Sequence, residues 1–400
     1  MSKSADTFPD IRKQAERIYA EQVRWRRHLH ANPELSTQEF ETTAFLTQQL
    51  RRIGARIVPL HRLKTGVIAE MAGHRPGSVV AIRSDMDALP ICEKSGLPFA
   101  SKVTGRMHAC GHDMHMAAVL GTAAVLSKLR DRYSGTVRFI FQPAEEMPPG
   151  GARPMIAEGA LKNVRMIFCL HVDPTVATGK IGLRDGVTMA SVCDFDLIIH
   201  GTGGHVARPH TTVDAIACAA EVVDSIQKIV SREIDPVLPA VISFGRIEGG
   251  TARNIVADRV TLTGTARSLS PALAKRIPAL IRRTAAGICR ARGARFEMNE
   301  IARYPVLSNH ARVNRIYASN YERMFGGGKI ESTDVVLGGE DFACYLEKVP
   351  GAMFRLGVMN KKIKADKPWH SDRFIADEQA LIFGTSLLCA AAVDTLKAVR

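Results

Sequence analysis

The sequence predicts an α/β protein with a mixed, mainly parallel sheet and a second, α+β domain inserted into its chain. Three strand-like runs, at 78–84, 135–142 and 166–170, are each followed by acidic or histidine residues. Parallel sheets place their ligands at such strand ends. The pattern of elements changes at about Met189 and reverts at about Tyr304. A chain of 400 residues also exceeds what one hydrophobic core ordinarily organises.

We therefore expect a first domain built from residues 1–188 and 304–400, and an inserted domain of residues 189–303. Apolar residues at helical spacing, or gathered in short β-branched runs, predict the elements of the first domain. Asn32-Pro33 ends the opening helix, and Gly54 is a plausible C-cap of the second. The expected helices are 9–30, 37–53, 114–129, 309–325 and 377–399, and the expected strands are 55–60, 66–71, 78–84, 135–142, 166–170 and 353–358.

The insert shows a different order of elements. Its expected strands are 191–200, 240–248, 258–268 and 294–302, and its expected helices are 212–232 and 271–292. Read along the chain this is β-α-β-β-α-β, the ferredoxin-like order. We expect the insert to fold as a separate α+β layer.

Composition excludes several classes of partner. The net charge is +14, but basic residues occur singly or in pairs such as Arg51-Arg52, and only 6% of residues are aromatic. This pattern does not favour nucleic-acid binding and indicates a basic surface that attracts anionic substrates. The eight cysteines show no paired spacing, the first helix has no signal-peptide core, and no uncharged run reaches membrane-spanning length. We expect a cytoplasmic protein with reduced thiols and no membrane contact.

The chemistry centres on residues 107–115, which read Met-His-Ala-Cys-Gly-His-Asp-Met-His. Cysteine and histidine are preferred ligands of zinc-like ions. Gly111 permits a turn that can bring Cys110 and His112 onto one ion. We interpret the stretch as a metal site; the alternative is a polar loop that caps the following helix with solvated histidines.

Two pairs of carboxylates extend this hypothesis. Glu145 and Glu146 follow a strand and a proline, where neighbouring side chains can point in different directions. One can then bind a metal while the other takes a proton from water and later protonates a leaving amine. Asp85 and Asp87 share a side of an extended segment, so Asp87 can orient a ligand histidine. The alternatives are a solvated acidic turn for the first pair and helix capping for the second.

These motifs occur in one order along nearly the whole chain. They are Asp-Met-Asp-Ala-Leu-Pro, His-Ala-Cys-Gly-His-Asp, Gln-Pro-Ala-Glu-Glu, Leu-His171, Gly-Gly-His205, Gly-Gly-Glu-Asp-Phe and His370. Together they resemble the amidohydrolase branch of the aminoacylase and carboxypeptidase G family, which includes hippurate hydrolases, N-acetyl-amino-acid deacetylases and auxin-amino-acid hydrolases. The resemblance implies a metallopeptidase-like catalytic domain and an inserted lid or dimerisation domain.

The resemblance also implies roles for individual residues. The family binds one or two divalent ions per subunit, here expected to be Mn²⁺, Zn²⁺, Co²⁺ or Ni²⁺. Glu145 matches the general base, and Asp87 is expected to support catalysis beside it. The matching metal ligands are Cys110, His112, Glu146, His171 and His370.

The family's insert dimerises and lends a histidine and an asparagine to the partner's active site, which by position are His205 and Asn254. They would stabilise the oxyanion of the tetrahedral intermediate. An arginine can hold a substrate carboxylate with two parallel hydrogen bonds. The substrate-binding candidates are Arg253 or Arg267, His210 and Gly339. We expect a homodimer or a dimer of dimers; in a monomer, His205 and His210 would be polar caps of the next helix.

The expected activity is metal-dependent hydrolysis of the amide bond of N-acyl amino acids, with an acetyl, benzoyl or similar acyl group. The products are a carboxylic acid and a free amino acid. A dipeptidase or carboxypeptidase acting on small peptides is the alternative within the enzyme class. A metal-binding homologue without turnover is the alternative outside it.

Overall fold

The computed structural model describes residues 8–398 and divides into two compact units. The first unit comprises residues up to Gly186, Ser308–Asp334 and residues from Cys344 onward, and the second comprises Val187–Leu307 and Val335–Ala343. Residues 1–7 and 400, which the expected first domain includes, lie outside the described residues. So does residue 399, at which the closing helix was expected to end.

Residues 335–343 belong to the second unit, whereas the sequence predicted them in the first domain. The backbone N–H of Ala190 donates hydrogen bonds to the carbonyl oxygens of Val336 and Gly338. Gly339 lies so close to Val192 that an added Cβ would meet that side chain at 2.3 Å. These contacts form between residues far apart in the sequence, so no local pattern indicates them.

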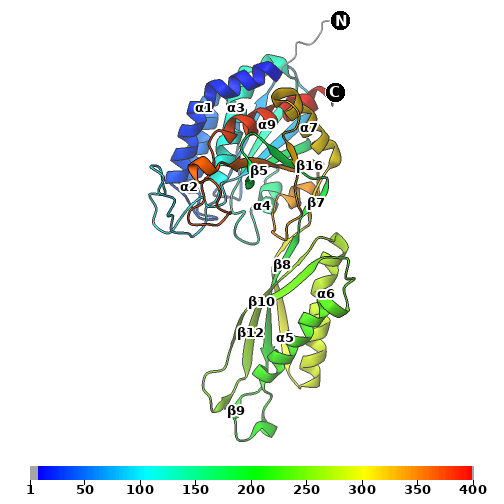
Figure 1. The fold of residues 1–400 in the computed structure, drawn as a ribbon. Helices are drawn as coiled ribbons and strands as arrows, with labels where there is room; N and C mark the ends of the chain where they lie inside the picture. The colour runs from blue at the N-terminus through cyan, green and yellow to red at the C-terminus, as the bar shows by residue number, and fades with distance from the viewer. Residues whose placement is uncertain (1–7, 399–400) are drawn as a thin grey trace. The chain divides into compact units, whose positions relative to one another are not determined.

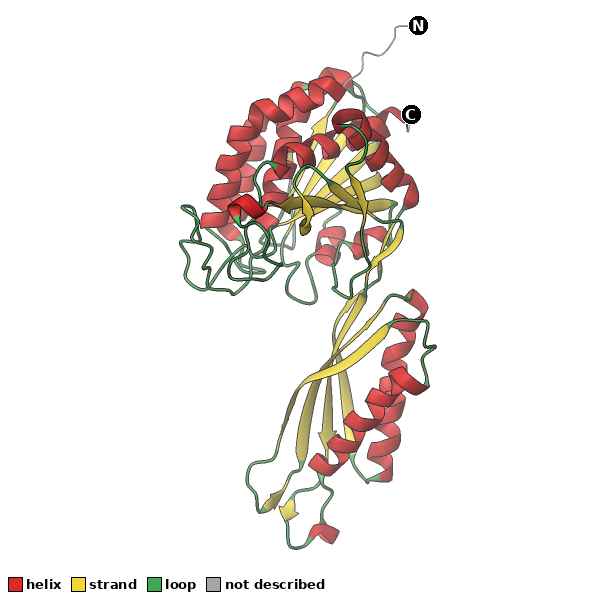
Figure 2. Ribbon diagram, viewed as in Figure 1, coloured by secondary structure: helices red, strands yellow, loops and turns green. Residues whose placement is uncertain are grey.

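The first unit is built on an eight-stranded sheet (Figures 1 and 2). Its strands, in sheet order, are β1 (Arg56–Val58), β2 (Val67–Ala72), β4 (Thr136–Gln142), β3 (Val79–Asp85), β5 (Val164–Ala177), β16 (Gly351–Met359), β6 (Ile181–Leu183) and β15 (Ile330–Ser332). The central strands β4, β3, β5 and β16 run parallel. Antiparallel pairs lie on both sides of them. The predicted mixed, mainly parallel sheet is confirmed.

Helices α3 and α9 lie against the central strands β3 and β5, and α1 packs on both helices. The helices are α1 (Phe8–Ala31), α2 (Phe40–Ile53), α3 (His112–Lys128), α4 (Ala152–Ala157), α7 (Ala311–Phe325), α8 (Ala343–Leu346) and α9 (Ala380–Ala398). By length and composition α9 alone among the described helices could span a membrane. However, 78% of its most apolar stretch is buried inside the protein, as in a helix of the core.

Three element boundaries differ from the prediction in ways that matter for the site. α2 begins at Phe40 rather than Thr37, because Thr37 has a φ of 68° that a right-handed helix does not allow. α3 begins at His112, two residues earlier than predicted. β5 continues beyond His171 to Ala177, because it stays paired with β16 past that residue.

The second unit has an antiparallel four-stranded sheet in the order β10-β12-β8-β13, with α5 and α6 on one face (Figure 2). In chain order the elements are β8 (Ser191–His200), α5 (Ala215–Arg232), β10 (Ala240–Gly249), β12 (Arg259–Ser268), α6 (Pro271–Ala291) and β13 (Arg295–Tyr304). This is the predicted β-α-β-β-α-β order. Asp214 caps α5, which therefore starts at Ala215 rather than at the predicted Thr212.

Short elements complete the chain. They are the strands β7 (Gly186–Met189), β9 (Gly204–His205), β11 (Ile255–Val256) and β14 (Leu307–Asn309), and the 3₁₀ turns η1 (Arg130–Arg132), η2 (Pro209–Thr211) and η3 (Lys361–Ile363). β9 and β11 pair with each other through His205 and Ile255. They form a small sheet of their own in the second unit.

Candidate metal centre

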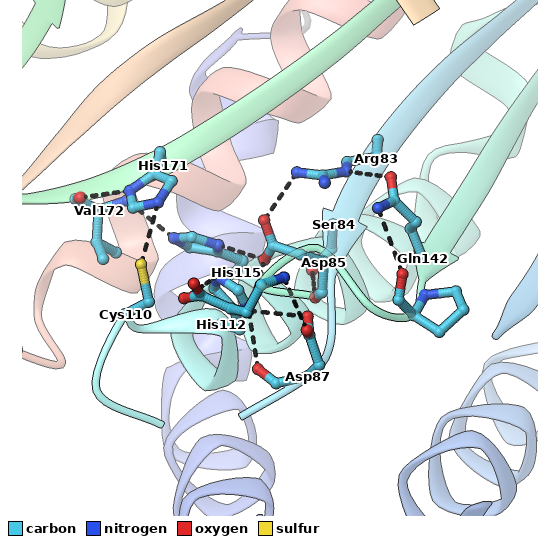
Figure 3. Close-up of polar contacts among 12 residues, drawn as sticks. Arg83, Ser84, Asp85, Asp87, Cys110, His112, His115, Gln142, His171 and Val172 are labelled. Carbon is cyan, nitrogen blue, oxygen red and sulfur yellow. Dashed lines mark hydrogen bonds and ion pairs between the residues drawn. The ribbon is translucent and has the colours of Figure 1, made fainter. Parts of the chain in front are cut away.

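A cluster of potential metal ligands lies in the first unit, beside β3 and β5 and at the start of α3 (Figure 3). Ligand atoms of Cys110, His112 and His171 lie within 4.8 Å of one another, as do those of Cys110, Glu146 and His370. The Oε1 atom of Glu146 is 3.3 Å from Nε2 of His370 and 3.9 Å from Nε2 of His112. The structure therefore brings together all five side chains that the sequence singled out as ligands.

The backbone explains how residues so close in sequence face one point. Gly111 has a φ of 87°, which turns the chain between Cys110 and His112. A Cβ at Gly111 would lie 2.4 Å from Cγ2 of Val172, so the turn also packs closely on β5. At the other end of the chain, the backbone N–H of His370 donates to the carbonyl oxygen of Ala109 at 2.9 Å. This bond ties the His370 loop to the loop of Cys110.

Hydrogen bonds fix which nitrogen of each histidine faces the cluster. Nδ1 of His112 lies 2.8 Å from the backbone oxygen of Asp87, and Nδ1 of His171 lies 2.8 Å from that of Val172. A carbonyl oxygen only accepts, so both Nδ1 atoms carry a proton, and each Nε2 is the nitrogen that faces the cluster and would bind a metal. This tautomer is the one that metal-binding histidines use.

Two atoms at the centre of the cluster are buried without a hydrogen-bond partner, Nε2 of His112 and Oε1 of Glu146. Buried polar atoms in this state are rare and call for a physical reason. Ligands of one zinc-like ion lie about 2.1 Å from it and hence about 3.4 Å apart. The spacings from Glu146 to His370 and His112, 3.3 and 3.9 Å, suit such an ion. The residues present therefore fit a divalent metal.

The electrostatics of the cluster favour added positive charge. Burial opposes charging of His112, but Asp85, Asp87 and Glu146 outweigh it and raise the pKa of that ring to about 10. Burial, followed by Glu146 and Glu145, raises the pKa of the Cys110 thiol well above its usual value. A bound divalent cation supplies the missing charge and deprotonates a coordinating thiol.

Asp87 contacts two of the five potential ligands. Besides its carbonyl bond to His112, its Oδ1 lies 3.4 Å from Nδ1 of that ring. Its Oδ2 accepts hydrogen bonds from the Ser36 hydroxyl at 2.6 Å and from the backbone N–H of Glu146 at 2.9 Å. Asp87 contacts a histidine, as the sequence predicted. It also holds the backbone of Glu146, which the sequence did not predict.

A second buried network, which was not predicted from the sequence, lies beside the cluster (Figure 3). Arg83 donates to Asp85 at 2.7 Å, and Asp85 lies 2.6 Å from Nδ1 of His115. Nε2 of His115 accepts from the backbone N–H of Val172 at 2.9 Å, beside His171. His115 lies three residues after His112 on α3, and neighbours on a helix face are spaced in this way. The three-residue spacing of His112 and His115 was the signal in the sequence from which a role for His115 could have been predicted.

The residues of the second unit that the sequence predicted as catalytic or substrate-binding lie in two separate groups. His205 and Asn254 are exposed and adjacent, since the N–H of Val206 donates to the carbonyl oxygen of Asn254. Arg253 precedes Asn254, and His210 lies in η2 after the β9 turn.

The other group is at the opposite end of β12. A guanidinium N–H of Arg267 donates to the carbonyl oxygen of Leu337 at 3.0 Å, near Gly339. β12 begins at Arg259, on the side of β11, and the eight residue-to-residue steps from Arg259 to Arg267 span about 26 Å. One small ligand cannot contact both groups of a single chain.

Comparisons with known proteins agree with this site. Residues 81–394 match Peptidase family M20/M25/M40. N-acetylcysteine deacetylase of Bacillus subtilis is 40% identical over 378 residues, which cover 94% of this chain and 97% of the relative. Thermostable carboxypeptidase 2 of Saccharolobus solfataricus is 39% identical over 366 residues, covering 90% and 92%. The crystal structure of a Bacillus subtilis protein, described as a dinuclear metal binding peptidase from M20 family, is 37% identical with a TM-score of 0.83, covering 96% and 99%.

The fold and the ligand cluster are those of a metal-dependent hydrolase. The match extends over most of the chain, and the relatives align over nearly their whole lengths. The chain belongs to Peptidase family M20/M25/M40. The resemblance to the amidohydrolase branch, first indicated by the sequence motifs, is confirmed.

Proposed function

We propose that this protein hydrolyses the amide bond of N-acyl amino acids with the help of one or two divalent ions held by Cys110, His112, Glu146, His171 and His370. The observation that carries the proposal is the position of Glu145. Its carboxylate, that of Glu146 and the His112 imidazole offer atoms within 4.8 Å of one another. A carboxylate beside the metal ligands is what hydrolysis of an amide requires of a general base.

In the proposed mechanism Cys110, His112, Glu146, His171 and His370 would hold the divalent cation, which when bound would polarise the scissile carbonyl and lower the pKa of a water molecule. Glu145 takes a proton from that water while the water oxygen attacks the carbonyl carbon. Glu145 then gives the proton to the nitrogen as the C–N bond breaks, which releases a carboxylic acid and a free amino acid. Asp87 and His115 keep the backbone and rings of the ligand residues in place through the bonds described above.

The choice of N-acyl amino acids follows the relative that is named for deacetylation of N-acetylcysteine. The relative named as a carboxypeptidase favours small peptides as a second candidate class. The two classes differ in the acyl side of the substrate, which is uncharged in an N-acetyl or N-benzoyl group and carries an amine in a dipeptide.

A substrate panel separates these classes. The protein is stripped with a chelator, reloaded with Mn²⁺, Zn²⁺, Co²⁺ or Ni²⁺, and assayed for release of free amino acid. We expect metal-dependent turnover of N-acetyl and N-benzoyl amino acids, with kcat/KM at least about tenfold above that for dipeptides, since the amine must be desolvated. Higher kcat/KM for dipeptides would support the peptidase alternative, and metal binding without turnover of either class would support a non-catalytic role.

We also propose that the inserted domain forms a dimer in which His205 and Asn254 serve the partner's active site. The separation along β12 supports this, because two copies can offer both groups of candidates to one substrate. Exposure of His205 and Asn254 fits donors that act on a partner.

Subunit mixing tests this proposal. Glu145→Gln and His205→Ala should each be inactive as pure dimers. After equal mixing by unfolding and refolding, half of the dimers are mixed and each has one intact site, so about a quarter of wild-type activity should return. A mixture that stays inactive while size-exclusion chromatography and mass spectrometry show mixed dimers would contradict shared sites. Glu145→Gln mixed with Glu145→Ala is the matched control.

A further inference from the structure

Glu39 is a buried acidic residue at the entrance to α2, and its carboxylate accepts hydrogen bonds from two backbone N–H groups. It is fully buried, and its Oε1 accepts hydrogen bonds from the N–H of Thr37 at 3.0 Å and of Ala144 at 2.9 Å. Ala144 is 105 residues away in sequence and directly precedes Glu145. A buried carboxylate is therefore in contact with the turn that carries the proposed general base.

Both residues that donate to Glu39 have an unfavourable backbone conformation. Thr37 has a φ of 68° and Ala144 has a φ of 53°, in the left-handed region that side chains other than glycine rarely adopt. Such conformations persist only where the surrounding structure holds them. Glu39 supplies part of that hold, because its oxygen fixes the N–H group of each strained residue.

Ala144 is held on its other side as well. Its carbonyl oxygen accepts a hydrogen bond from the backbone N–H of Gly151 at 3.0 Å. Two residues later, the N–H of Glu146 donates to Asp87 at 2.9 Å. Glu39 thus anchors the peptide between Pro143 and Ala144, Gly151 anchors the peptide between Ala144 and Glu145, and Asp87 anchors the N–H of Glu146. Together these anchors define the direction in which the Glu145 side chain leaves the backbone.

We propose that Glu39 is a positioning residue for Glu145: its carboxylate holds Ala144 in the left-handed conformation that aims the Glu145 side chain at the metal cluster. The inference rests on the role proposed above for Glu145. Glu39 acts through the backbone and does not touch substrate. Because Asp87 anchors Glu146 separately, loss of Glu39 should misplace the general base more than the metal ligand.

Three substitutions of Glu39 test this role. Glu39→Ala removes both hydrogen bonds, Glu39→Asp withdraws the oxygen by one methylene, and Glu39→Gln keeps an acceptor oxygen at full length. Burial, reinforced by Asp87, raises the pKa of Glu39 to about 7, so glutamine resembles a form that is populated near neutral pH. Glu34→Ala is the matched control, since Glu34 accepts from the backbone N–H groups of Glu41 and Thr42 at the same helix start.

We expect kcat of Glu39→Ala and Glu39→Asp to fall about 10- to 100-fold, as small misplacements of a reacting group do. KM and the metal dissociation constant, measured by chelator competition, should stay within about threefold of wild type because the substrate and metal ligands are unchanged. Glu39→Gln should recover most of kcat, and Glu34→Ala should keep kcat near wild type.

Wild-type kcat in folded Glu39→Ala would overturn the inference, as would an equal loss in Glu34→Ala or a loss that follows metal affinity alone. If Glu39→Ala does not fold, Glu39→Asp decides the question by the same criteria. Glu145→Gln is assayed in parallel. If Glu145→Gln keeps its activity, the proposed catalytic role of Glu145 fails; if Glu145→Gln is inactive while the Glu39 variants have wild-type kcat, only the positioning role fails.

Discussion

Replacing Glu145 with glutamine should nearly abolish amide hydrolysis while the protein stays folded and keeps its metal. Glutamine has the shape of glutamate but cannot take a proton from water or return it to a leaving nitrogen. General acid–base catalysis contributes a factor of about 10²–10⁴, so kcat should fall by that amount. The measurement is the initial rate of amino acid release from N-acetyl amino acids at saturating metal.

Glu146→Gln provides the contrast for this experiment. Oε1 of Glu146 lies 3.3 Å from the His370 imidazole and belongs to the proposed ligand set. Its variant should therefore bind metal more weakly, whereas the Glu145 variant should bind it as wild type does. Wild-type turnover by folded Glu145→Gln would show that another group moves the proton. Loss of metal from Glu145→Gln would instead make Glu145 a ligand.

The fold was predictable wherever the sequence carries a local pattern. Local sequence patterns locate the order of the insert and all strands of the eight-stranded sheet except β6 and β15. Two of the differences between prediction and structure depend on distant partners. β5 continues past His171 because β16 pairs with it, and residues 335–343 join the second unit through Ala190 and Val192. Neither partner is close in sequence.

The same distinction holds for the candidate metal centre. The five potential ligands could be found because cysteine, histidine and paired carboxylates are unusual in a short stretch or directly after a strand. Arg83 and Glu39 were not recognised, and His115 was part of the predicted metal-binding stretch without a role of its own. Each of the three is buried, and each supports the cluster or the turn beside it. Their function depends on being opposite a particular backbone group or carboxylate, and a single sequence does not encode that contact locally.

A group of buried charged side chains, Arg26, His30 and Asp113, should contribute strongly to the stability of the first unit. Nε of Arg26 donates to Oδ2 of Asp113 at 2.7 Å, and Nδ1 of His30 lies 2.9 Å from the same oxygen. Arg26 and Asp113 are 1% and 0% exposed. Burial opposes ionisation of Asp113, but Arg26 and then His30 outweigh it and hold its pKa well below the usual value. Asp113 follows His112 directly, so this network also supports the first turn of α3.

Asp113→Ala should lower the free energy of unfolding by about 3–5 kcal/mol at neutral pH, because it leaves the buried Arg26 guanidinium without its closest partner. Urea unfolding followed by tryptophan fluorescence measures this in the first unit alone, since both tryptophans, Trp25 and Trp369, belong to it. Asp131→Ala is the control. Asp131 pairs with Arg132 at 3.4 Å on the surface, and losing such a pair costs less than about 1 kcal/mol.

The sign of the pH dependence separates the charge of Asp113 from its packing. A carboxylate whose pKa is depressed by folding stabilises the protein above its unfolded pKa of about 3.9, and this contribution is lost as the pH falls toward the folded pKa. The part of the difference in unfolding free energy between wild type and Asp113→Ala that comes from the carboxylate charge should therefore shrink as the pH falls below about pH 4. A difference that stays constant below pH 4 would mean that Asp113 stabilises the first unit by packing. A difference under about 1 kcal/mol at neutral pH, as for the surface control, would show that Arg26 is satisfied by Glu378, which lies 3.2 Å from its Nη1.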